Sequence, residues 1–237
     1  MSAKSREPIR LTPRYFSLLL ASLMIVLVLA PQFEDSYFGA ILMHAGLTAV
    51  FVTGVIANRQ QKVVFRGSLI LAAVAIPLTW IAFVTESVEV SLGQYAVVIL
   101  FCGVTGGLIL SAVLRDYLGA IQAVLGAICV YLLIGLAWAT SYAAIERIEP
   151  QSFDFNHHRT TRTSSGQTHT AFPQLVYVSF VTMSTLGYGD VTPRTPLAET
   201  ATWMQSVVGQ LYIAILIARL VTELPRPRRR VADGEPS

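Results

Sequence analysis

The sequence predicts an all-α membrane protein with six transmembrane helices and a short re-entrant helix and loop between the fifth and the sixth. Three observations predict this class. The 237 residues are 54% hydrophobic and only 13% charged, whereas soluble domains carry about 25% charged residues. Six apolar runs reach or approach the roughly 20 helical residues that cross about 30 Å of hydrocarbon. The charges gather in the segments between these runs.

The six runs follow from hydropathy alone and are residues 15–30, 37–57, 68–84, 95–114, 117–144 and 201–221. A polar loop, 146–170, separates the fifth run from a shorter apolar run, Phe172–Met183. The shorter run is too brief to span the hydrocarbon and ends at a glycine-rich stretch, so it fits a re-entrant helix, 172–184. Pro173 suits the first turn of that helix.

The charges between the runs predict the orientation. Basic residues precede the first run, separate the second from the third, and end the chain: Lys4, Arg6, Arg10, Arg14; Arg59, Lys62, Arg66; Arg219, Arg226, Arg228, Arg229 and Arg230. The segments after the first and third runs carry only acids: Glu34, Asp35, Glu86 and Glu89. The pattern weakens after the fourth run, where Arg115 adjoins Asp116. By the positive-inside rule, both termini lie in the cytoplasm of a cell-membrane protein. The first run could instead be a signal peptide, but Pro31 should hinder cleavage.

The stretch "STLGYGDVTP" at 184–193 follows the short helix. Non-helical backbone at membrane depth is tolerated only where protein or a water-filled cavity surrounds it. Gly187 and Gly189 can take backbone angles closed to other residues. Such angles let successive carbonyls face one axis, where a dehydrated cation is a natural partner, while Leu186 and Tyr188 point away and pack behind. An ordinary glycine-rich loop is the alternative.

"TLGYGD" at 185–190 resembles the selectivity filter of the potassium channel family, whose related TVGYG loop holds ions with carbonyl oxygens. The resemblance extends over residues 117–221: outer helix, outer loop, pore helix, filter and inner helix. It implies carbonyl ion sites at Thr185, Leu186, Gly187, Tyr188 and Gly189, with K⁺ held at the first four of these residues. Passive conduction of K⁺ is the function that it implies.

The resemblance also assigns supporting roles around the filter. Asp190 would tie the outer mouth to the pore helix, and Tyr177 lies where the family often places an aromatic donor. Val181 stands where some bacterial members have a buried glutamate, which implies a different hydrogen-bond support in this chain. Gly209 lies midway along 201–221 and is a candidate gating hinge, although close helix packing explains a glycine there equally well.

The implied domains are a basic cytoplasmic tail (1–14), a four-helix transmembrane domain in the position of a voltage sensor (15–116), a pore domain (117–224) and a second basic cytoplasmic tail (225–237), which could touch anionic lipid. The run 95–114 contains no basic residue. Steep voltage gating needs about three to four charges per subunit. We therefore expect a six-transmembrane, one-pore-loop, prokaryotic-type channel that lacks a charged voltage sensor.

The partners follow from the same resemblance. A filter needs four such strands, and this chain has one, so we expect a homotetramer. No acid–base pair in the membrane, phosphate loop or zinc pattern is evident in the sequence, so we expect no enzyme, no nucleic acid and no cofactor besides K⁺ as the permeant ion. A regulatory subunit that needs a partner chain and a component of an ion-coupled transporter are the alternatives. His44, inside the second run, could sense protons or be a neutral, hydrogen-bonded side chain, and the loop histidines 157, 158 and 169 could act at the mouth.

Overall fold

The computed structural model describes residues 14–29, 32, 37–57, 62–85, 87–114, 120–155 and 172–222. Both predicted tails, apart from Arg14, lie outside these segments, and so do Arg115, Asp116 and the three loop histidines. The described elements are mostly helical: α1 (Arg14–Leu29), α2 (Tyr37–Ala57), α3 (Lys62–Thr85), α4 (Val88–Leu114), α5 (Ala120–Ile148), β1 (Phe153–Phe155), α6 (Phe172–Met183), β2 (Val191–Pro193) and α7 (Pro196–Thr222).

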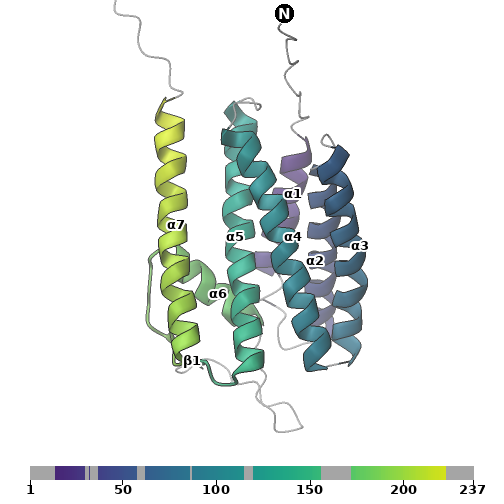
Figure 1. Ribbon diagram of the computed structural model, residues 1–237, viewed down its shortest axis with the longest axis vertical. Coiled ribbons are helices and arrows are strands. Elements are labelled where there is room, and N and C mark those ends of the chain that lie inside the picture. The colour runs from purple at the N-terminus through teal and green to yellow at the C-terminus, as the bar shows by residue number, and fades with distance from the viewer. Residues whose placement is uncertain are drawn as a thin grey trace, which may run out of the picture.

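The long helices stand alongside one another in one bundle (Figure 1). Helices α1–α4 form one side, α7 stands at the opposite edge, and α5 lies between them. The short helix α6 lies near one end of the bundle and contacts both α5 and α7. The start of α1 and the end of α7 lie at the same end of the bundle (Figure 1).

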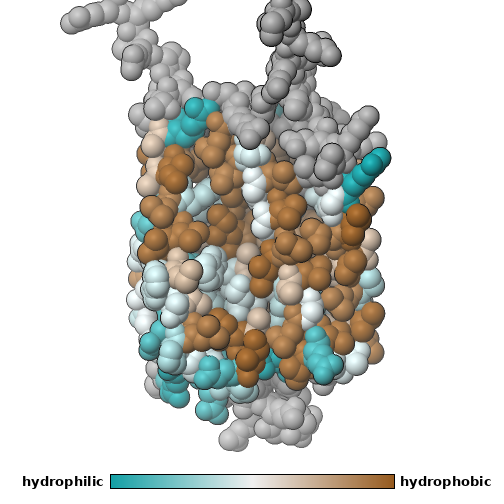
Figure 2. Space-filling view, viewed as in Figure 1, coloured by the Kyte–Doolittle hydropathy of each residue, from teal (hydrophilic) through white to brown (hydrophobic). Residues whose placement is uncertain are grey.

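Within the described residues, four helices contain segments long and apolar enough to cross a membrane: Phe65–Thr85, Val88–Leu114, Ile121–Ile148 and Pro196–Arg219. The apolar stretches of α1 and α2 are shorter, Phe16–Val28 and Ile41–Ala57. Figure 2 shows apolar residues over the middle of the visible face and hydrophilic ones mostly toward the ends. The structure therefore fits an all-α membrane protein, and the first two crossings remain predictions.

Several helices extend beyond the predicted apolar runs. Helix α4 begins at Val88 and α7 at Pro196, seven and five residues before the runs they contain. Their first turns contain Glu89 and Glu199. A search for apolar runs leaves these acids outside the helices, whereas the positive end of a helix favours acids in its first turn. The Ala198 N–H also donates to Thr195 Oγ1 over 3.4 Å, as at an N-cap. Helices α3 and α5 likewise run past their apolar cores, whereas α6 ends at Met183, one residue earlier than expected.

A single apolar cluster joins α1–α4 to α5 and reaches Tyr212 of α7. At its centre the rings of Phe51 and Phe101 pack edge to face, with centroids 4.8 Å apart. Edge-to-face aromatic pairs are more favourable than face-to-face stacks. This core fixes α5, on which α6 is positioned.

Two short strands on either side of α6 form a small antiparallel sheet that the sequence did not predict. Strand β1 pairs antiparallel with β2, with Phe153 opposite Pro193. An Arg194–Asp154 ion pair and a 2.7 Å bond from the Arg194 N–H to the Ser152 carbonyl extend the pairing. Because β1 follows α5 and β2 precedes α7, the pairing of the two strands brings the chain back from α6 to the end of the bundle where α5 ends.

Candidate functional site

Helix α6 ends in an unusual turn at Thr185. The Thr185 N–H donates to the Thr182 carbonyl over 3.0 Å, and the Leu186 N–H donates to the Val181 carbonyl over 2.9 Å. These two bonds define a Schellman motif, which requires a left-handed residue and is usually completed by glycine. Thr185 has φ 59°, which is a genuine outlier for a β-branched residue. Strain of this kind clusters at functional sites.

The backbone after this turn alternates in handedness. Positive φ occurs at Thr185, Gly187 (53°) and Gly189 (74°), and not at Leu186 or Tyr188. Such alternation allows successive carbonyls to face the same side, whereas in a regular strand they alternate. In the part of the chain that the structure describes, no hydrogen-bond donor meets the carbonyls of 185–189. Unpaired carbonyls require water or a cation as a partner, so this row of oxygens is chemically suited to bind one.

The segment 184–189 is exposed in the single chain. Leu186 is 54% exposed and Tyr188 68% exposed. The predicted packing of these two side chains behind the segment is therefore not made within one copy of the chain.

Tyr177 and Asp190 meet beside this segment. The Tyr177 hydroxyl donates to Asp190 Oδ2 over 2.7 Å, and the Val191 N–H donates to Asp190 Oδ1 over 3.1 Å. The hydrogen bond to the carboxylate is the largest of the effects that raise the pKa of Tyr177 to about 12, so the phenol stays protonated and remains a donor. The structure thus brings together the two residues singled out as filter support and ties the end of the segment to α6.

A buried polar chain links α6 to both neighbouring helices. The Tyr142 hydroxyl of α5 donates to Gln205 Oε1 of α7. Gln205 Nε2 donates to Ser179 Oγ over 2.7 Å and to the Ser179 carbonyl over 3.0 Å. The Ser179 hydroxyl in turn donates to the Gly135 carbonyl of α5 over 2.7 Å. Tyr142, Ser179 and Gln205 are completely buried, so these bonds are made without competing water.

The sequence analysis missed this network. The run 201–221 contains two amides, Gln205 and Gln210, and the sequence alone does not distinguish the buried one from the exposed one. Val181 cannot form a side-chain hydrogen bond, and its carbonyl instead accepts the Leu186 N–H. Because position 181 holds no glutamate, the sequence predicts a hydrogen-bond support of another kind behind α6. The Gln205 network provides hydrogen bonds there.

Two glycines allow α6 to approach its neighbours. A Cβ added at Gly135 would lie 2.5 Å from the Phe180 ring, and one added at Gly209 would lie 2.8 Å from the Met183 carbonyl oxygen. Real Cβ atoms do not come so close, so both positions need glycine for contact. For Gly209 the structure supplies the packing explanation, and its role as a hinge remains a prediction.

Residues 130–225 match a family model described as "Ion channel". The matched region covers most of α5, both short strands, α6, the segment 184–189 and α7. The match supports ion channel activity. With the four apolar helices, it indicates an integral membrane protein and points to transport rather than catalysis. Comparisons with curated proteins and with solved structures gave no match.

Proposed function

We propose that this chain is one subunit of a potassium-selective channel that conducts K⁺ passively. The observation that best supports this proposal is the alternating backbone of 185–189, which follows the Schellman turn at the end of α6. Among the described residues, no hydrogen-bond donor meets the carbonyls of this backbone. In this proposal α6 is a re-entrant pore helix, and the oxygens of Thr185–Gly189 replace the hydration shell of the ion. K⁺ is the transported ion and not a resident cofactor.

Four copies of the chain would complete the pore. Non-helical backbone cannot face lipid, yet the segment 184–189 is exposed in one copy. Helix α7 is also poorly covered, since 22% of its apolar window is buried against 56% for α5. Its exposed apolar side chains include Trp203, Met204, Val207, Leu211 and Ile215. A homotetramer would cover the segment with the other copies and leave the remaining apolar surface to lipid.

The same proposal assigns a passive role to the α1–α4 side of the bundle. Helix α4 occupies the sensor position in the chain order and contains no Lys or Arg. Moving one charge through 100 mV changes the free energy by about 2.3 kcal/mol, so a helix without such charges gives little voltage dependence. We therefore expect only weak voltage gating.

Substitution of Gly187 tests the proposal. An added Cβ at Gly187 would meet nothing within 4 Å in the chain, so only its φ of 53° disfavours alanine. The left-handed conformation costs a non-glycine residue about 1–2 kcal/mol. Gly103 of α4 has equally open surroundings and no positive φ, which makes Gly103→Ala a matched control.

The measurement is K⁺ flux into liposomes that contain the purified chain alone. We expect Gly187→Ala to lower the flux at least about tenfold and Gly103→Ala to leave it near the wild-type value, with the same oligomer in both variants. Equal flux from Gly187→Ala and wild type would reject the filter assignment. Absence of flux from the wild-type protein would instead favour a subunit that needs a partner chain.

A further inference from the structure

A cavity of about 160 Å³ lies between α2, α3, α4, α5 and the start of α6. None of the residues 184–189 lines it, so it is separate from the candidate filter. The residues that line the cavity lie toward the ends of α3 and α5 and the starts of α2, α4 and α6. The cavity is therefore toward the end of the bundle at which the β1–β2 sheet lies.

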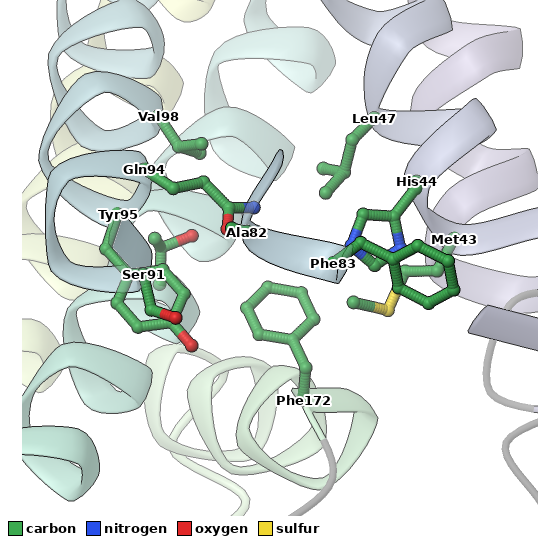
Figure 3. Close-up of a pocket in the computed structure, with 11 residues that line it drawn as sticks. Met43, His44, Leu47, Ala82, Phe83, Ser91, Gln94, Tyr95, Val98 and Phe172 are labelled. Carbon is green, nitrogen blue, oxygen red and sulfur yellow. The ribbon is translucent and has the colours of Figure 1, made fainter. Parts of the chain in front are cut away.

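One side of the cavity is aromatic. The His44 and Phe83 rings lie with centroids 4.7 Å apart and tilted by 49°, and Met43 adjoins them. Phe172, the first residue of α6, reaches into the cavity from below (Figure 3). Aromatic rings and methionine sulfur make favourable contacts with a flat ring.

The other side, from α4, is polar. Gln94 extends from α4 toward His44 across the cavity, and Tyr95 lies beside it (Figure 3). Among the residues that the structure describes, we find no hydrogen-bond partner for the Gln94 amide or the Tyr95 hydroxyl. The Ser91 hydroxyl donates to the Ser87 carbonyl just before α4, and the Thr140 hydroxyl donates to the Leu136 carbonyl of α5, both over 2.8 Å. Both hydroxyls keep acceptor lone pairs.

The lining itself carries no formal charge. None of the described residues that line the cavity is Asp, Glu, Lys or Arg, and the charge that acts on it is that of the Arg147 guanidinium, through Tyr95. A charged ligand without an opposite charge beside it would be strongly disfavoured in such a site. Apolar walls with a few convergent polar groups are instead typical of sites for small organic molecules.

We propose that this cavity binds a small, uncharged, monocyclic aromatic molecule with one hydroxyl group, of the phenol class. The size fits, because an apolar cavity of about 150 Å³ holds one benzene ring. The ring would contact His44, Phe83 and Phe172, and the hydroxyl would exchange hydrogen bonds with the Gln94 amide. Such a ligand partitions into the membrane interface, from which the end of the bundle is reached.

Binding is tested on the purified full-length protein in detergent with 4-fluorophenol as the probe, observed by ¹⁹F NMR. We expect saturable binding with a Kd on the order of 1 mM, displaced by phenol and at least about fivefold weaker for fluorobenzene. Ala82 lines the cavity and is buried, so Ala82→Phe should fill the space and abolish binding. Val84→Phe, at a 79% exposed position of the same helix, is the matched control and should bind normally.

Gln94→Leu gives a second test that keeps the cavity open. It should reduce the preference for 4-fluorophenol over fluorobenzene to less than about twofold while both probes still bind. Thermal unfolding and size-exclusion profiles check that each variant is folded. No saturable binding to the wild type, or equal binding to a folded Ala82→Phe variant, would overturn the proposal and leave a cavity that holds only water. Because the readout is binding, the outcome does not depend on whether the protein conducts K⁺.

Discussion

The side chains of Tyr177 and Asp190 are thirteen residues apart in the sequence and 2.7 Å apart in space. The bond between them holds the end of the exposed segment against α6. The pKa of Tyr177 is raised to about 12, so the neutral donor form is favoured in the folded protein. The contribution of this bond to stability is thus fully present below the ordinary tyrosine pKa of 10 and is lost as the pH rises through about 12.

We predict that Tyr177→Phe destabilises the conducting form of the filter. Loss of one partly exposed hydrogen bond costs about 1 kcal/mol, or roughly a fivefold change in an equilibrium. The open probability of single channels at neutral pH measures this effect. Tyr131→Phe is the control, since no hydrogen bond of the Tyr131 hydroxyl is seen among the described residues. Equal open probabilities for the two variants would contradict the role given to Tyr177.

At the residue scale, the backbone of 185–189 could be predicted only in part from the sequence. Glycine at 187 and 189 predicts backbone angles closed to other residues, and φ is positive at both positions in the structure. The left-handed Thr185 could not be foreseen, because threonine disfavours that conformation and adopts it here only as part of the turn that ends α6.

Among the elements, α6 is held from both sides. The buried chain from Tyr142 through Gln205 to Ser179 joins three helices, and Gly135 and Gly209 allow close contact. Fully satisfied buried polar networks rigidify the structure around them. Displacement of α7 would therefore be transmitted to α6 and to the segment that follows it.

We predict that Gln205→Leu destabilises the protein by about 1–3 kcal/mol, because it leaves the buried Tyr142 hydroxyl without an acceptor. Chemical or thermal unfolding in detergent measures the change. Gln210→Leu, at an exposed position of the same helix, should change stability by less than about 0.5 kcal/mol. In the double variant Gln205→Leu/Ser179→Ala, the two losses should not add, because the residues share one network. Strict additivity would show that the network is not coupled.

Helix existence was predictable from hydropathy, and helix ends were not. The starts of α4 and α7 were misplaced because Glu89 and Glu199 belong to first helical turns rather than to loops. The β1–β2 pairing was missed because its strands have three residues each and are separated by 35 intervening positions. Such non-local pairing leaves no periodic signal in either segment.

For the molecule as a whole, the packing is uneven across the bundle. Its core joins α1–α4 to α5, whereas α7 and the segment 184–189 remain largely uncovered. The sequence predicts the number of copies only through its filter-like stretch, which occurs once per chain. The positions that would contact another subunit cannot be predicted from hydropathy, because lipid-facing and subunit-facing positions are both apolar.

We predict that the purified protein forms a complex of four 25.8 kDa chains. Native mass spectrometry measures the protein mass after detergent is removed. Cross-linking should give bands up to the tetramer and none beyond it. A complex that stops at two chains would contradict the proposed pore, since two segments cannot surround one ion.

The reversal potential of the purified wild-type protein in a planar bilayer, with K⁺ on one side and Na⁺ on the other, tests the central claim most directly. If carbonyl oxygens of 185–189 replace the hydration shell of K⁺, the reversal potential should lie close to the K⁺ limit, at a permeability ratio above about ten. A reversal potential near zero, with Na⁺ passing as readily as K⁺, would contradict the account.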